Sequence, residues 1–406
     1  MKTWRFFTLF TTGTLLLTSA CTQDKSTPEP IEGKPIHLSA RVANQTTDFA
    51  FDLLQNIDAT ESKEENIFVS PLSLHIALGM LLNGSEGETR EGIIKAIRAE
   101  GLTPDDLNAA YQTLMRELPE ADKKVQLALA NSMWYREGFE VKNSFKQVLA
   151  DIFSSQIYDE PFDGGTVKKI NQWASDHTAG KIDQVIDQID GGMVMFLMNA
   201  LYFKGDWTHE FDKDKTQDWN FSLSSGGEKQ VKMMFLEKEL RNYSDDDFDV
   251  VELPYSAGQF NLTLFVPKAG KDIHSLLQEF DSHKWQTVQD GLHKGKTYVG
   301  LPKFTLKYEI FLNEILSAMG MERVFTDQAE LGGIADARIL VSFVKQNTFL
   351  GIDESGTEAA AVTSIGIELT SVGPSRKTVI ADKPFFFTIS ENTSNTILFT
   401  GRIMSP

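Results

Sequence analysis

The sequence predicts a mixed α+β fold that forms one domain over residues 41–406. Apolar residues recur at helical spacing through most of the first 180 residues, whereas short strand patterns separated by turns dominate the remainder. This division of helices and strands is typical of an α+β domain. The 406 residues contain no internal repeat and no second domain boundary, although the length would also accommodate two ordinary domains.

Helices are expected first along the chain. Apolar spacing predicts a helix over 42–57, and Ser70 and Pro71 suit the N-cap and the first turn of the next helix. Further helical patterns cover 87–98, 104–118, 143–152 and 166–178, with a strand over 125–134 among them.

Strands follow. The stretch 193–203 is almost wholly apolar, which is expected of a central strand covered on both faces. Further strands are expected over 248–253, 260–266, 296–304, 339–350, 378–381, 385–390 and 396–399, and one helix over 309–319.

The N-terminal residues predict a secreted protein. Two basic residues precede an apolar run over 6–17, which is too short to cross a membrane, and small residues then lead to Cys21. We expect residues 1–20 to be a lipoprotein signal peptide and Cys21, at the position where bacterial lipoproteins are cut, to be lipidated. The alternative is an ordinary signal peptide with Cys21 at its boundary. Because Cys21 is the only cysteine, no disulfide can form within the chain.

The segment after this cysteine is polar and rich in proline, and such a composition buries too little surface to order itself. Residues 21–40 are therefore expected to be the lipidated cysteine and a disordered tether. Thr22 stands where an aspartate would argue for the inner membrane, so by analogy with bacterial lipoproteins the outer membrane is favoured. The expected location is the cell envelope, or the extracellular space.

Net charge narrows the possible partners. The formal net charge is −18, and no basic cluster dense enough for a polyanion occurs. An acidic surface argues against nucleic acid as a partner.

Catalytic motifs are missing. Ser342 and Lys345 have the Ser-x-x-Lys spacing of penicillin-binding enzymes, but the two accompanying motifs do not occur, and Ser342 lies in an alternating strand pattern. The sequence contains no His-Glu-x-x-His, no cysteine pair and no phosphate-binding glycine loop before a helix. We therefore predict a protein that is not an enzyme and that uses no cofactor and no metal.

The most informative segment lies near the C-terminus. Read as a strand, 357–369 places small or apolar residues on one face, beginning with Thr357, Ala359, Ala361 and Thr363. Glycines at 356, 366 and 373 instead suit a loop. The segment thus combines the features of a loop and of a strand.

These residues resemble the reactive-centre loop of the serpins. The resemblance extends along nearly the whole chain after about residue 40, through the motifs at 66–74, 196–207, 301–304, 382–385 and 398–403. It implies the serpin fold: N-terminal helices around a large mixed sheet, further β-sheets, and an exposed reactive-centre loop near the C-terminus.

The same resemblance implies a suicide-substrate mechanism, in which a protease cuts the loop and is trapped as an acyl-enzyme while the loop inserts into the main sheet. Family spacing places the scissile bond between Thr370 and Ser371, or alternatively after Leu369. Such residues suit an elastase-like serine protease; a papain-like cysteine protease is the alternative target. A non-inhibitory binding protein with the serpin fold is the alternative function, and the protein is expected to be a monomer.

Three groups of residues would operate the insertion. The hinge is assigned to Glu354, Gly356, Thr357, Glu358, Ala359, Ala360, Ala361 and Thr363, with Gly356 as a pivot through positive φ. The shutter, which lets the sheet open, is assigned to Ser70, Ser73, Asn199 and Gln346. Trp207 would mark the breach at the top of the opening. Gln346 replaces a histidine of the family pattern and cannot titrate, so pH dependence through that position should be missing.

Overall fold

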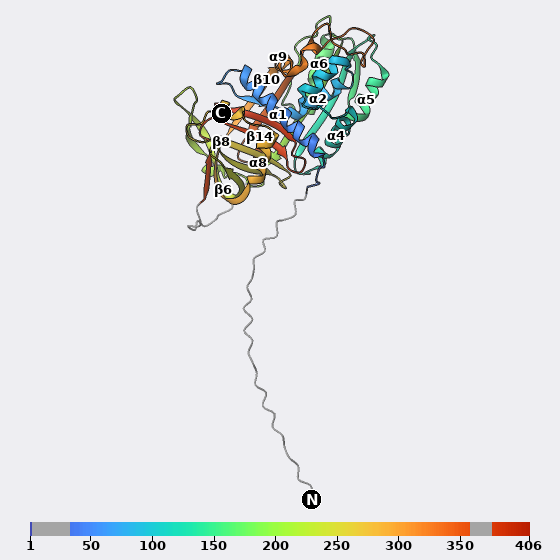
Figure 1. The fold of residues 1–406 in the computed structure, drawn as a ribbon. Helices are drawn as coiled ribbons and strands as arrows, with labels where there is room; N and C mark the ends of the chain where they lie inside the picture. Colours follow the sequence, from blue (N-terminus) through green and yellow to red (C-terminus); the bar gives the residue numbers. More distant parts are fainter. Residues whose placement is uncertain (2–32, 358–375) are drawn as a thin grey trace. The chain divides into compact units, whose positions relative to one another are not determined.

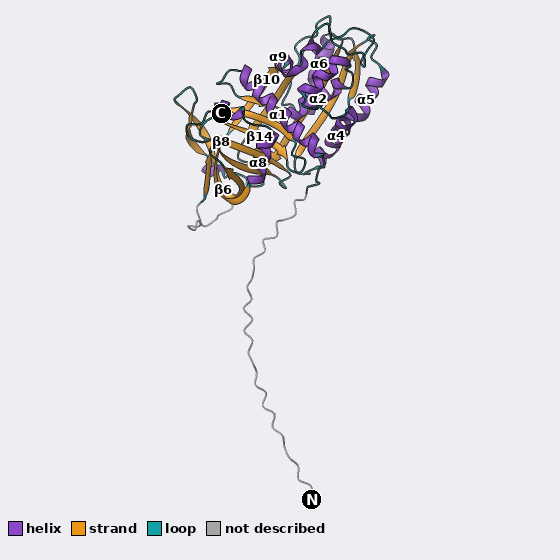
Figure 2. Cartoon of the chain, in the orientation of Figure 1, coloured by secondary structure: helices purple, strands orange, loops and turns teal. Residues whose placement is uncertain are grey.

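The computed structural model describes residue 1 and residues 33–357 and 376–406. Residues 33–357 and 376–406 belong to one unit, in which helices lie against two β-sheets (Figures 1 and 2). The predicted α+β class is confirmed. No helix in the described part of the chain is long and apolar enough to span a bilayer.

The first sheet contains, within these residues, six strands in the order β10-β11-β12-β4-β2-β3. Only β2 and β3 pair in parallel. The strands are β2 (Gln126–Arg136), β3 (Gln156–Glu160), β4 (Met195–Asp206), β10 (Phe304–Phe311), β11 (Lys345–Ile352) and β12 (Gly356–Thr357). Strand β4 is central, as predicted, but several of its residues are only half-buried, because one of its edges lies along a cavity described below.

The second sheet has nine strands among the described residues, in the order β1-β15-β14-β8-β7-β6-β9-β13, with β5 paired to β6. The strands are β1 (Ile67–Val69), β5 (Gln217–Ser222), β6 (Glu228–Ser244), β7 (Phe248–Tyr255), β8 (Phe260–Pro267), β9 (His293–Pro302), β13 (Lys377–Ile380), β14 (Phe385–Glu391) and β15 (Ile397–Ile403). Strands β8, β14 and β15 are buried along their whole length, which explains their continuous apolar runs.

The α-helices are α1 (Ala40–Thr60), α2 (Pro71–Leu82), α3 (Gly87–Ala96), α4 (Pro104–Glu117), α5 (Asn143–Phe153), α6 (Gly164–His177), α7 (Ile273–Leu277), α8 (Ser282–Gly291) and α9 (Asn313–Leu316). Helix α2 is buried on nearly every side and packs against β4 and β15, so it forms the centre of the core. The predicted cap is confirmed, since the Ser70 hydroxyl accepts a hydrogen bond from the Ser73 amide at 3.2 Å.

A buried ion pair ties the end of the chain to α1. Arg402 and Asp58 are both fully buried and contact each other, and His274 and Lys63 also bond to the Asp58 carboxylate. Burial alone would raise the pKa of Asp58, but the hydrogen bonds from His274 and Lys63 and the charge of Arg402 lower it to about 2. The carboxylate therefore stays ionised, and the pair fixes β15 beside α1.

Two expected elements around residue 311 are wrong in part. The predicted helix over 309–319 begins only at Asn313, because β10 continues to Phe311, which pairs with Lys345. The predicted strand over 339–350 begins only at Lys345. The Asn313 side chain bonds to the backbone of Ser342 and of Val344, so these groups do not pair with a strand. Ser342 therefore does not lie in a strand.

The folded unit begins before residue 41. Ile36 is fully buried, and its amide donates to the Thr393 hydroxyl at 2.7 Å. The Lys34 amide donates to the Ala121 carbonyl at 3.2 Å, and Ser39 caps α1. These contacts place residues 33–40 in the folded unit, whereas the sequence had assigned them to a disordered tether; residues 2–32 lie outside the described part.

Candidate functional site

The hinge begins with a tight reversal between β11 and β12. The Asp353 carboxylate accepts hydrogen bonds from the amides of Ser355 (2.8 Å) and Gly356 (3.3 Å), as in an Asx-turn. The reversal aligns Thr357 with Ile352 on β11 and with Gly205 on β4. The chain thus leaves β11 and turns back into the position between β11 and β4.

Gly356 is required by close packing rather than by an unusual backbone conformation. A Cβ atom at this position would lie 2.2 Å from the Gly205 carbonyl oxygen, which is far inside van der Waals contact. Its φ angle is not positive, so the expected pivot through positive φ is not the conformation observed here. The glycine lets β12 approach β4 closely.

Trp207 fixes the hinge from the β4 side, where the sequence predicted the breach. Its ring nitrogen donates to the Asp353 carbonyl at 2.9 Å, and its amide donates to the Ser355 carbonyl at 2.8 Å. The indole stacks on Tyr255 with 4.5 Å between ring centroids. The Tyr255 hydroxyl in turn bonds to the Thr357 hydroxyl at 2.6 Å. Burial raises the pKa of Tyr255, so the phenol stays neutral.

Glu354 is held by a second set of contacts on the other side of the turn. Lys303 bonds to one carboxylate oxygen at 2.7 Å, and the Thr216 hydroxyl donates to the other at 3.0 Å. Burial works to raise the pKa of Glu354, but these hydrogen bonds and the charge of Lys303 outweigh it and lower the pKa below its ordinary value. The carboxylate is ionised at neutral pH and anchors the turn.

The predicted shutter residues come together where the start of α2 packs against β11 and β4. The Gln346 side chain accepts from the Ser70 amide and donates to the Ser70 carbonyl, both at 2.9 Å. The Ser70 hydroxyl donates to the Leu398 carbonyl at 2.8 Å, and the Ser73 hydroxyl donates to the Asn199 side chain. These bonds connect β11 to α2 and α2 to β4, although β11 and β4 are not adjacent.

Sequence reasoning missed four residues that complete these networks. Asn131 accepts from the Asn199 amide at 2.6 Å and donates to the Phe153 carbonyl at 2.7 Å, so the polar chain continues to β2. The other three are Lys303, Thr216 and Tyr255. A buried asparagine in an apolar strand pattern was the available signal for Asn131, and Lys303 lies in the 301–304 motif. Thr216 and Tyr255 lie far from the hinge in sequence and carry no local signal.

A slot separates β4 from β11 below the hinge. Among the described residues these two strands pair with β12 and not with each other. A cavity of about 470 Å³ lies between them, bounded by α2 and α6. Its walls are mostly apolar, with Ser73, Asn199 and Gln346 among the polar residues that line it. At the hinge end of the slot, Thr357 of β12 pairs with both strands.

Several predicted residues lie outside the described part of the chain. They are Cys21, Glu358, Ala359, Ala360, Ala361, Thr363, Leu369, Thr370 and Ser371. Within the described residues, no group of three or more His, Cys, Asp or Glu side chains could hold a metal ion.

Comparisons with known proteins agree on one family. The family described as Serpin (serine protease inhibitor) matches residues 44–406. The chain is similar to the leukocyte elastase inhibitor of Sus scrofa, at 31% identity over 89% of this chain and 98% of that protein. Its structure is similar to the native state of Tengpin, a thermophilic serpin (TM-score 0.85, 29% identity, 92% of this chain and 96% of that one). It is also similar to thyroxine-binding globulin in complex with thyroxine (TM-score 0.81, 25% identity, 90% and 99%).

Proposed function

This chain belongs to the serpin family, and we propose that it inhibits serine proteases as a suicide substrate. The observation that carries the proposal is the seated hinge: Thr357, 3% exposed, already occupies the first position of a strand between β11 and β4, above an unfilled slot. A protease that cuts the reactive loop would form an acyl-enzyme, and insertion of the loop into this slot would carry the protease along.

The pairing register supports insertion of the loop into this slot. Each residue after Thr357 would pair one residue further back along both β11 and β4. By that count Thr363 would arrive between Asn199 and Gln346, beside the shutter, where its hydroxyl could bond to either amide. Thr363, a polar residue of the loop, would thus meet the polar section of the slot.

The side-chain pattern agrees with this register. Thr357 points inward toward Tyr255, so Ala359, Ala361 and Thr363 would also point inward. Small uncharged residues are required there, since a buried unpaired charge costs several kcal/mol. A loop with no such task has no reason to alternate in this way.

The target is proposed to be an elastase-like serine protease that cuts between Thr370 and Ser371, or after Leu369. The leukocyte elastase inhibitor relative and the small or aliphatic loop residues both favour this specificity. Inhibition of papain-like cysteine proteases is the alternative at the same site.

The test is a mixture with an elastase-type protease, separated on a denaturing gel. A boil-stable complex of the two chains is expected, and sequencing of the released C-terminal peptide identifies the cut bond. The matched control is Ala361→Glu, whose inward charge should turn the protein into a substrate that is cut without trapping the protease. If the wild type is cut and no complex forms with any of a panel of serine proteases, the proposal is wrong.

A binding protein that uses the serpin fold is the second candidate, favoured by the similarity to thyroxine-binding globulin. Thermal unfolding of loop-cut and intact protein separates the two. An inhibitor should gain stability when a single cut lets the strand insert, because new hydrogen bonds and apolar burial outweigh the freed chain entropy. An unchanged or lower transition temperature favours the binding protein.

The cellular setting is also a proposal. A signal peptide over residues 1–20 and lipidation of Cys21 would hold a monomeric inhibitor in a bacterial cell envelope, with the outer membrane favoured by Thr22.

A further inference from the structure

Three methionines gather at the start of β4. Met193, Met195 and Met198, the slot methionines, are half-buried, and all three line the cavity between β4 and β11. Met115 and Met319 are also half-buried, but they do not line this cavity. Other methionines of the described part are closed off from solvent, since each is at most 1% exposed: Met80, Met133, Met233, Met234, Met321 and Met404.

The slot methionines lie on both faces of β4. Met195 packs against the main hydrophobic core, whereas Met193 and Met198 pack against a second, smaller cluster to which α6 contributes. Residues 195–204 pair with β2 on one side of the strand. On the other side, among the described residues, β4 pairs with β12 only through its last two residues. The edge of β4 beside the slot methionines is therefore unpaired within the described part of the chain.

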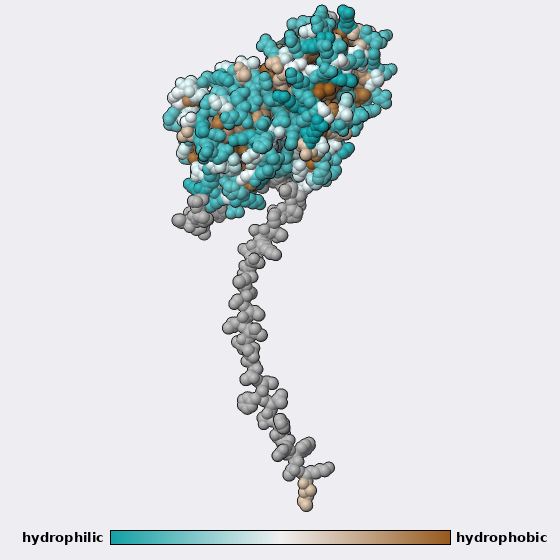
Figure 3. Space-filling view, viewed as in Figure 1, coloured by the Kyte–Doolittle hydropathy of each residue, from teal (hydrophilic) through white to brown (hydrophobic). Residues whose placement is uncertain are grey.

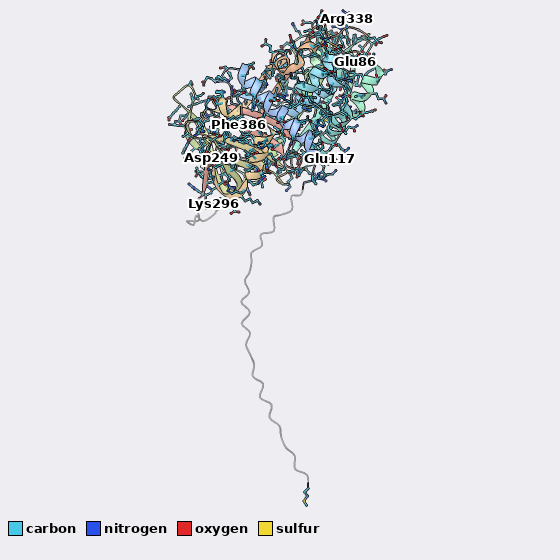
Figure 4. All side chains as sticks on the ribbon, viewed as in Figure 1. Glu86, Glu117, Asp249, Lys296, Arg338 and Phe386 are labelled. Carbon is cyan, nitrogen blue, oxygen red and sulfur yellow. The ribbon has the colours of Figure 1, made fainter. Side chains whose placement is uncertain are left out.

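The cavity reaches the surface at this end of β4. Leu340 lines it and is 44% exposed, and the lining residues Arg338 and Gly192 are exposed as well. Figure 4 shows Arg338 at one end of the folded unit, opposite to Lys296. The face shown in Figure 3 is mostly hydrophilic, so a space lined by thioethers and aliphatic side chains differs from the outer surface. A small neutral solute can therefore reach the three thioethers.

We propose that Met193, Met195 and Met198 form a modification site for peroxides, and that their oxidation prevents a strand from entering the slot. The effect on the slot rests on the proposed function, whereas the modification itself does not. In the reaction the thioether sulfur attacks one oxygen of hydrogen peroxide, the O–O bond breaks, and the second oxygen leaves as water with both protons. The sulfur is oxidised to a sulfoxide and the peroxide is reduced, so no further reactant is needed.

The open slot tolerates a sulfoxide, whereas a filled slot does not. The sulfoxide oxygen accepts hydrogen bonds, and in a cavity of about 470 Å³ it can bond to water. A strand seated between β4 and β11 would displace that water and bury the oxygen. The side-chain amides of Asn199 and Gln346, which line the same cavity, already donate to the Asn131 side chain and the Ser70 carbonyl. Because an unpaired buried acceptor is unfavourable, oxidation should slow the filling of the slot.

The first test maps the modification. The folded protein is treated with hydrogen peroxide, and catalase stops the reaction; a Cys21→Ser parent protein is used so that no thiol competes for the oxidant. Mass spectrometry of peptides follows the gain of oxygen at each methionine. The slot methionines should react at least about tenfold faster than the buried Met233 and Met234, because the reaction requires access to the sulfur. Equal rates at the slot and buried methionines would overturn the modification site.

The second test compares trapping of an elastase-type protease before and after treatment. In the parent protein, roughly tenfold more inhibitor molecules should be cut for each protease trapped after oxidation, and methionine sulfoxide reductases should reverse the change. Residues 358–375 contain no methionine and no cysteine, so oxidation of that segment cannot account for the loss.

Two variants serve as matched controls. A triple variant, Met193→Leu, Met195→Leu and Met198→Leu, nearly conserves side-chain volume and should trap equally before and after treatment. A double variant, Met115→Leu and Met319→Leu, keeps the slot methionines and should respond like the parent protein.

The outcomes separate the inference from the proposed function. If peroxide impairs the triple variant as much as the parent protein, or if the parent protein traps normally after its slot methionines have reacted, the inference is wrong. If the untreated parent protein traps no protease, the proposed function fails and the effect on trapping with it. The mapping then still decides whether the slot methionines are the modified residues.

Discussion

Replacing Thr357 with arginine should convert the inhibitor into a substrate. The native side chain is buried between β11 and β4, and its hydroxyl bonds to the Tyr255 phenol at 2.6 Å. The new side chain would lose this bond and bring a charge against a stacked pair of aromatic rings, Tyr255 and Trp207. Among the described residues no carboxylate is bonded to Tyr255 or Thr357, so the charge would have no partner there.

The magnitude follows from that environment. A lost hydrogen bond costs about 1 kcal/mol, and an uncompensated buried charge costs about 3–5 kcal/mol. The uncut variant escapes this cost when β12 leaves the sheet, and insertion must then return the charge to the same buried site. At about 1.4 kcal/mol per factor of ten, insertion should slow by roughly three to four orders of magnitude. Hydrolysis of the acyl-enzyme would then outrun insertion, and many inhibitor molecules would be cut for each protease trapped.

The assay is the stoichiometry of inhibition, read from residual protease activity and from the complex band on a gel. Thr357→Ser keeps the hydroxyl and should behave like the wild type. Trapping by Thr357→Arg at the wild-type stoichiometry would refute the assignment of this residue as the first position of the inserted strand.

Three further outcomes are expected. Cys21→Ala should move the protein from the membrane fraction to the soluble fraction or block its maturation, and unchanged membrane retention would exclude lipidation there. Lys303→Gln should lower the free energy of unfolding by about 1 kcal/mol or less, because the lysine is half exposed. The loss should be present at pH 7 and fade as the pH falls through the pKa of Glu354, which is lowered below 4.5. Urea unfolding of the variant and the wild type at pH 7 and at a pH below that pKa measures the difference. An equal loss at the two pH values would contradict the pairing of Lys303 with Glu354. Gln346→His should lower the thermal transition relative to wild type as the pH falls below about 6.5, because a protonated imidazole cannot accept from the Ser70 amide. Transition temperatures that change in parallel with pH in the two proteins would show that this hydrogen bond does not contribute to the stability of the sheet.

Elements that depend on local sequence patterns were predicted correctly. Helix α2, its Ser70 cap and the central strand β4 follow from apolar periodicity and capping chemistry, and the structure confirms them. The shutter assignment came from resemblance, and the structure brings Ser70, Ser73, Asn199 and Gln346 into one network.

Other features depended on long-range contacts. Asn313 decides where β11 begins, since its side chain bonds to the backbone of Ser342 and Val344 about thirty residues later. Ile36 is buried where Thr393 and Ala121 accept hydrogen bonds from the backbone amides of Ile36 and Lys34. The polar, proline-rich composition of residues 21–40 predicted disorder, because composition averages over a segment and cannot show that one residue, Ile36, is buried.

Chain connectivity explains why complete filling of the slot would require a cut or the release of β13 from β9. In the observed register Thr370 would arrive beside residue 192 of the β4 segment, about 46 Å from the hinge at ~3.3 Å per residue. Arg376 is fixed to Glu237 on the loop side, and the six residues from Thr370 to Arg376 reach at most about 22 Å. Six residues reach about half the length of the slot, so a filled slot and a docked β13 exclude each other unless the chain is cut or β13 leaves the sheet. Under the proposed mechanism, covalent geometry would therefore withhold the free energy of strand insertion until a protease cuts the loop.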